Sequence, residues 1–125
     1  KMPQKFNDLL EMLAHESGQL LVETLPKYLN DEIIPQEQNH DEATVCKMIK
    51  KEDGLLDLAS EPYQNYLKFL ALNPWPGTYY FLEKDDKKIR IKITDAEFTE
   101  GQLIIKKIIP EGKKEMNYAD FMRNQ

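Results

Sequence analysis

The sequence is divided by Asn73-Pro74-Trp75-Pro76-Gly77 into a first part with helical periodicity and a second part with strand periodicity. Each proline fixes its own φ at about −65° and moves the residue before it out of the α region, while Gly77 permits a turn that other residues resist. The only tryptophan of the chain is therefore held at a stiff corner. It serves either as a plug between two elements or as a presented stacking surface. The plug is the favoured interpretation, because large aromatic side chains mostly bury area.

Upstream of the corner, apolar residues recur at spacings of three and four, which predicts a helix over residues 6–29. Its apolar face comprises Phe6, Leu9, Leu10, Leu13, Leu20, Leu21, Leu25 and Tyr28. This face needs a partner to cover it. We expect Gly18 to mark a close crossing with another element and Pro26 to bend the last turn.

The segment between this helix and the corner is mostly polar. Residues 30–42 lack a sustained period, which predicts a linker. Residues 43–49 are interpreted as a short strand or an extended edge, and residues 50–54 as a turn. Ser60 is the expected N-cap of a second helix, with Pro62 in its first turn, and this helix should end at the proline corner.

Downstream of the corner the apolar period becomes two. Residues 78–82 predict a strand and residues 83–87 a charged turn. Residues 88–93 alternate strictly, which sends three isoleucines to one face and three cations to the other. Turns are expected at 100–101 and 110–112, a strand at 103–109, and a closing helical turn or strand at 118–122. Short strands at this spacing predict a small barrel or sandwich.

Composition and charge narrow the functional classes. The 125 residues suffice for one domain, or for one small domain with an appendage. One cysteine excludes an intramolecular disulfide, and two histidines without ligand spacing argue against a zinc site. No apolar run reaches about 18 residues and no signal-peptide pattern is present, so we expect a cytoplasmic protein without a membrane partner. Neither a glycine-rich phosphate loop nor a catalytic nucleophile setting occurs, which favours a binding or scaffolding module.

The net charge of −5 is unevenly distributed, since residues 1–82 carry −6 and residues 83–125 carry +1. The strand face of Lys88, Arg90 and Lys92 is a candidate for tracking a phosphate backbone. Further cations that contribute to it are Lys84, Lys106, Lys107, Lys113, Lys114 and Arg123. The alternative is the solvated outside of a strand.

With the corner at its centre, the chain resembles the carboxy-terminal part of the methionyl-tRNA formyltransferase family. Ordered segments on both sides carry the resemblance. Upstream they are Leu13-Ala14, Leu20-Leu21, Leu25, Ala43-Thr44, Lys47, Lys51-Glu52-Asp53-Gly54 and Leu56-Asp57. Downstream they are Gly101, Leu103, Gly112-Lys113-Lys114, Met116 and Asp120-Phe121. Together these segments cover nearly the whole chain.

The resemblance implies an α+β fold of two helices with a small OB-like β-barrel. Residues 1–29 would be the terminal helix of the catalytic domain, 30–42 a linker and 43–125 the OB-like tRNA-binding domain. The expected partners are initiator methionyl-tRNA and an amino-terminal catalytic domain, which uses 10-formyltetrahydrofolate to formylate the methionine amino group. The family's catalytic asparagine, histidine and aspartate lie outside this sequence, so the chain alone is expected to be inactive. The implied tRNA-binding residues are Lys88, Arg90, Lys92, Lys106, Lys107, Lys113 and Lys114.

Two other functions remain open from the sequence. The chain could belong to a sugar-nucleotide formyltransferase or a formyltetrahydrofolate dehydrogenase, which reuse such a domain, or be a stand-alone interaction module. In any of these, the apolar face of the first helix predicts self-association when nothing covers it.

Overall fold

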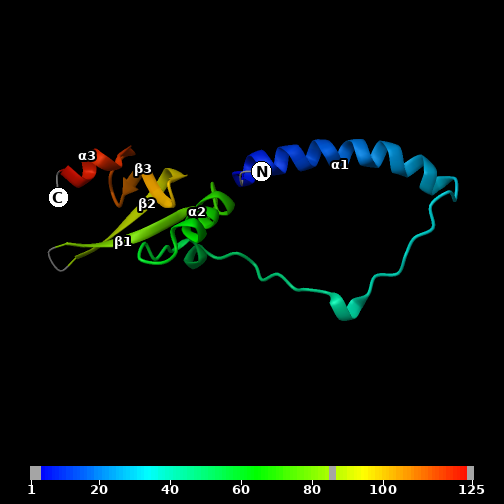
Figure 1. The fold of residues 1–125 in the computed structure, drawn as a ribbon, viewed down its shortest axis with the longest axis horizontal. Helices are drawn as coiled ribbons and strands as arrows, with labels where there is room; N and C mark the ends of the chain where they lie inside the picture. The colour runs from blue at the N-terminus through cyan, green and yellow to red at the C-terminus, as the bar shows by residue number, and fades with distance from the viewer. Residues whose placement is uncertain (1–3, 85–86, 124–125) are drawn as a thin grey trace. The chain divides into compact units, whose positions relative to one another are not determined.

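The computed structural model describes residues 4–84 and 87–123 (Figure 1). The chain divides into two compact units. Asn7–Met48 forms one, and Ile49–Gln125 together with the residues before Asn7 forms the other. The expected boundaries at residues 29 and 42 remain predictions.

The first unit consists of most of helix α1 (Phe6–Leu29) and the polar segment that follows it. The helix has the predicted bounds, includes Pro26 and buries none of its residues. No described atom lies within 4 Å of the Cβ that Gly18 would carry, so the close crossing expected there is not made by the described chain. A short 3-10 helix, η1 (His40–Glu42), begins where the Asn39 side chain accepts a hydrogen bond from the Asp41 amide. Residues 43–50 form no strand, so the strand interpretation of 43–49 was wrong.

The second unit is an antiparallel sheet with helices. Its strands follow the order β1 (Thr78–Lys84), β2 (Lys87–Thr99), β3 (Gln102–Pro110) and β4 (Met116–Asn117). The 3-10 helix η2 (Lys51–Gly54) and helix α2 (Pro62–Ala71) precede the sheet, and α3 (Tyr118–Arg123) follows it (Figure 1). The α+β class is confirmed. The barrel is not confirmed, because no pairing between described residues joins β1 to β4.

The core lies on the isoleucine face of β2. Ile91 and Ile93 are 0% and 2% exposed, while Lys88, Arg90 and Lys92 are exposed, so the predicted alternation is confirmed. The cluster also contains Ile108 from β3, Phe69 and Leu70 from α2, Tyr80 from β1, Phe121 from α3, Leu56 and Ala96. Each such side chain contributes about 1.5–3 kcal/mol when fully buried, so this face of the sheet holds α2 and α3 in place.

Strand β2 continues six residues beyond its predicted end through a register shift between Ile93 and Ala96. The shift allows both of these residues to face the core although they are three positions apart. Strict alternation stops at Ile93, which is why the pattern alone ended the strand there. At the other end of β2, the middle of the charged turn expected at 83–87 lies outside the described residues.

Helix α2 begins one residue later than expected. Glu61, not Ser60, is its N-cap, and the carboxylate accepts hydrogen bonds from the amides of Tyr63 and Gln64 at 3.0 and 2.6 Å. Ser60 instead donates its hydroxyl to the carbonyl oxygen of Asp57 at 2.7 Å. The Glu side chain is longer than that of Ser, so its two carboxylate oxygens can reach the amides of both Tyr63 and Gln64. The usual preference for Ser at an N-cap does not anticipate this arrangement.

Candidate nucleic-acid interface

The outer face of the hairpin β1–β2 combines cations with aromatic rings. The antiparallel register places Tyr79 opposite Lys92 and Phe81 opposite Arg90. The Arg90 guanidinium carbon lies 3.8 Å from the centre of the Tyr79 ring, and Lys88 Nζ lies 4.9 Å from the centre of the Phe81 ring. Such cation–π contacts favour a fixed position for each charge on the sheet surface. The positions of Lys88 and Arg90 are therefore supported by the rings, and Tyr79 is buried beneath Arg90 although it lies on the outer side.

An open groove of about 420 Å³ lies between the proline corner, strand β2 and the carboxy-terminal end of β3. Its lining residues are Lys51, Trp75, Pro76, Arg90, Lys92, Ile109, Pro110, Glu111 and Gly112. Three of them are cations that come from η2 and β2. The groove therefore places positive charge and an indole next to one another.

Trp75 is not the plug that the sequence suggested, because its side chain is 61% exposed. The junction is closed by backbone instead. A Cβ on Gly54 would clash with the carbonyl oxygen of Gly77, and Lys92 Cε would lie 2.9 Å from a Cβ on Gly77. Because η2 and the Lys92 stem occupy this space, no gap remains for an indole, and the Trp75 ring lies at the surface.

The corner itself is tied to its neighbours on both sides. Both bonds preceding its prolines, Asn73–Pro74 and Trp75–Pro76, are cis, and Gly77 has a φ of +76° that favours glycine. The Gly77 amide donates to the carbonyl oxygen of Leu72 at 2.8 Å, and the Leu56 amide donates to that of Tyr79 at 2.8 Å. These bonds join the end of α2, the corner and the segment after η2, so they fix Trp75 and Lys51 on the same side of the sheet.

The remaining predicted cations differ in their surroundings. Lys106 pairs with Glu97 at 2.7 Å, and Lys107 with Glu115 at 3.8 Å. Lys113 and Lys114 lie exposed between β3 and β4. Among the side chains that the structure describes, Lys88, Arg90 and Lys92 form no ion pair. The charge of this trio is therefore the more accessible to an anionic partner.

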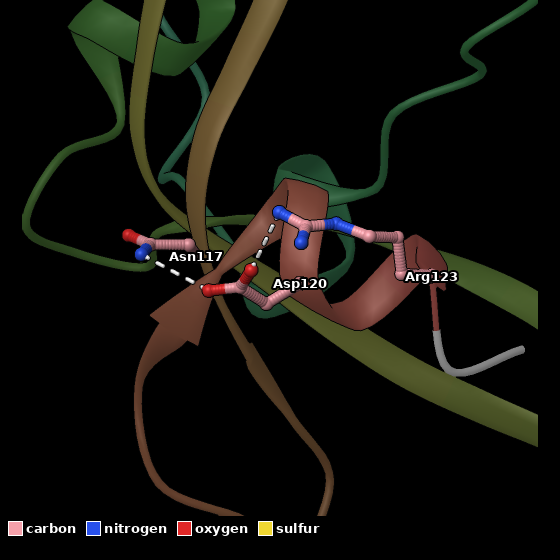
Figure 2. Close-up of polar contacts among 3 residues, drawn as sticks. All are labelled: Asn117, Asp120 and Arg123. Atoms are coloured by element: carbon pink, nitrogen blue, oxygen red, sulfur yellow. Dashed lines mark hydrogen bonds and ion pairs between the residues drawn. The ribbon is translucent and has the colours of Figure 1, made fainter.

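Arg123 is engaged within the closing helix. Its Nη2 donates to Asp120 Oδ1 at 2.9 Å, and Asn117 Nδ2 donates to the other oxygen of the same carboxylate at 3.2 Å (Figure 2). This arrangement joins β4 to α3 and offsets the charge of Arg123. The side chain of Lys84 lies outside the part of the chain that the structure describes.

Sequence reasoning missed Lys51 and Phe81 as members of this surface, and it held the exposed position of the Trp75 ring only as the less favoured alternative. A signal for Phe81 was present. Side chains alternate in both strands, and residues that pair across the charged turn lie on the same face. Tyr79 and Phe81 are therefore expected on the face that carries the cations of β2. No local pattern places Lys51 there, because it reaches the groove through the contact of Gly54 with Gly77.

The groove is poorly suited to binding a metal ion. Glu111 is the acidic lining residue of the groove, and its Oε2 accepts a hydrogen bond from the Arg90 amide at 3.4 Å. Within the described residues, no group of three His, Cys, Asp or Glu side chains is arranged to hold a metal ion. The arrangement is thus suited to contacts with phosphates and flat rings.

Comparison with known proteins identifies the relatives of the chain. No family model matches it. A methionyl-tRNA formyltransferase of Campylobacter jejuni is 34% identical over an alignment that covers 95% of this chain and 44% of the relative. The chain corresponds to the carboxy-terminal part of methionyl-tRNA formyltransferases. The enzymes of that name from Rickettsia bellii and Campylobacter lari are 29% and 39% identical, over 98% and 80% of this chain.

The chain spans less than half the length of these methionyl-tRNA formyltransferases, with 46% of the Rickettsia bellii protein and 31% of the Campylobacter lari protein covered. None of the helices in the described part of the chain has the length and apolar character required to span a bilayer.

Proposed function

We propose that this chain holds initiator methionyl-tRNA for a cytoplasmic methionyl-tRNA formyltransferase. An amino-terminal catalytic domain would transfer the formyl group from 10-formyltetrahydrofolate to the methionine amino group. The residues for that step would belong to that domain. The observation that supports the proposal is the exposed cationic face of Lys88, Arg90 and Lys92, on which Lys88 and Arg90 lie against the rings of Phe81 and Tyr79, in a chain homologous to enzymes of that name.

Binding through this face would act by positioning. Cations that neutralise phosphates release condensed counterions, which supplies sequence-independent affinity and a steep salt dependence. Holding the body of the tRNA limits the volume that its aminoacyl end explores, and this raises the effective concentration of the amino group at the catalytic domain. The net charge of the whole chain is negative, so the sorting of cations onto one face is essential to the proposal.

The test is charge reversal in the full-length enzyme. We expect Arg90→Glu with Lys92→Glu to weaken tRNA binding about tenfold or more and to lower the slope of log affinity against log salt by roughly 1.5. Adding Lys88→Glu should extend both effects. The matched control is Lys27→Glu with Lys47→Glu, which removes the same charge from α1 and the polar segment. Equal affinity and slope in the two double variants would exclude the proposal.

The expected OB-like barrel belongs to this proposal as well. The Leu55–Tyr79 bridge places a fifth segment beside the free edge of β1, parallel to it, which supports a more closed sheet than the four named strands alone provide. The alternatives of a sugar-nucleotide enzyme, a folate dehydrogenase or a stand-alone module are not favoured, since the relatives described above are named methionyl-tRNA formyltransferases.

A further inference from the structure

We propose that the groove beside Trp75 is a subsite for one unpaired nucleotide, whose base stacks on the indole and whose phosphate contacts Arg90 and Lys92. This inference rests on the proposed function, and it states which part of an RNA the groove accepts. The volume of about 420 Å³ lies in the range of small-ligand sites, which suits a single nucleotide and excludes a duplex from the interior.

The Trp75 indole provides a stacking surface in the groove. Trp75 is 61% exposed, yet its backbone is held between two prolines and next to the Gly77–Leu72 hydrogen bond. Because the backbone is already held, the stacking of a base orders only the side chain of Trp75, which limits the conformational freedom that is lost. Both faces of a base inside a duplex are covered by its neighbours. Only an unpaired or terminal base therefore offers a free face to the indole.

The phosphate would bind at the cations that line the groove. The Arg90 guanidinium has one face on the Tyr79 ring, which leaves its N–H edges available to donate to phosphate oxygens. The Lys92 stem passes over Gly77, and its ammonium therefore lies near the corner. Lys51 contributes a third cation from η2. These groups come from separate elements that the core and the corner hold in register, so the cationic end of the groove is built before a ligand arrives.

The lining of the groove is not uniformly cationic. Glu111 is its acidic lining residue and would repel a phosphate. A carboxylate accepts hydrogen bonds from the amino group of a base such as cytosine. Glu111 therefore favours the base over the phosphate at its own position. We expect Glu111→Gln to strengthen binding of inorganic phosphate and to weaken the preference for amino-bearing bases.

The experiment uses the 125-residue chain, in which Trp75 is the only tryptophan and its emission reports directly on the groove. Two RNAs are titrated separately into the chain and compared at equal phosphate concentration, namely a four-nucleotide single strand and a long duplex, in which only the two terminal base pairs expose a base face. We expect the single strand to quench the emission and the duplex to leave it nearly unchanged. Equal quenching by both, or none by the single strand, would overturn the inference.

A second measurement uses fluorescently labelled single-stranded RNA with variants of the indole. Trp75→Ala should weaken binding roughly tenfold and Trp75→Phe should retain most of the affinity, while neither changes the salt slope. Because the side chain is exposed, both variants should unfold at the same temperature as the parent chain. Equal affinity of the two variants would contradict the stacking.

The two proposals fail separately. If Trp75→Ala binds the single strand normally while Arg90→Glu with Lys92→Glu weakens tRNA binding in the full-length enzyme, the subsite is excluded and the proposed function stands. If the charge reversal also has no effect, the proposed function is excluded as well.

Discussion

At the scale of single residues, Tyr80 links the core to pH. It is 7% exposed, and burial raises the pKa of its hydroxyl well above the ordinary value of about 10, with the neighbouring Tyr118 adding to the rise. Above pH 10 the unfolded chain loses this proton and the folded chain keeps it. Because the unfolded state then binds fewer protons, the free energy of unfolding falls as the pH rises.

We predict that the Tyr80 hydroxyl does not affect the free energy of unfolding below about pH 10. Above that pH, it lowers the free energy of unfolding by up to about 1.4 kcal/mol per pH unit. Tyr80→Phe should remove that part of the alkaline decline, although it also loses the interaction with Tyr118. Tyr28→Phe, on the exposed face of α1, is the control. The measurement is urea denaturation between about pH 8 and pH 11, on either side of the ordinary tyrosine pKa. Parallel pH profiles for the two variants would contradict the prediction.

The position of the Trp75 ring could not be predicted from its neighbours in the sequence. The prolines correctly indicated a stiff corner. Whether the ring at that corner lies inside or outside depended on Gly54, which precedes α2 and is therefore distant from the corner along the chain. Its contact with the Gly77 carbonyl oxygen fills the junction. Neither residue type nor local backbone preference predicts the tertiary contact between Gly54 and Gly77.

At the scale of elements, the cap of α2 offers a direct test. Glu61 accepts hydrogen bonds from two amides of the first turn, which would otherwise lack partners in the helix. We expect Glu61→Ala to lower the free energy of unfolding by about 1 kcal/mol. Glu61→Gln keeps an acceptor and should lose less. Denaturation midpoints give the comparison, and an unchanged midpoint for Glu61→Ala would show that solvent satisfies these amides equally well.

Elements with a clear period were predictable, and those fixed by tertiary contacts were not. The helix over residues 6–29 and the alternation of Ile89, Ile91 and Ile93 follow from side-chain spacing alone. The continuation of β2 to Thr99 depends on a register shift against β3, which no single-strand pattern encodes. The cations of β2 were correctly placed on the outer face for the same reason as the isoleucines. The groove was missed because η2, the corner and β3 meet only after folding.

At the scale of the whole molecule, the apolar face of α1 is the main unsatisfied surface. Every residue of the predicted stripe is exposed, with Leu13 at 49% and Leu20 at 63%. Full burial of such side chains contributes about 1.5–3 kcal/mol each, so covering even a few is strongly favourable. In the proposed enzyme, the amino-terminal catalytic domain would cover this face. In the isolated chain, a second copy is the available apolar partner.

We therefore predict that the 125-residue chain forms dimers or larger species at high concentration, and that Leu13→Glu with Leu20→Glu makes it monomeric. Arg90→Glu with Lys92→Glu changes a polar surface of the sheet and should leave the association unchanged. Light scattering across a concentration series measures the outcome, and a strict monomer at every concentration would contradict it. In the full-length enzyme the same leucine variants should instead lower stability, since there the charges would face the domain that covers the helix.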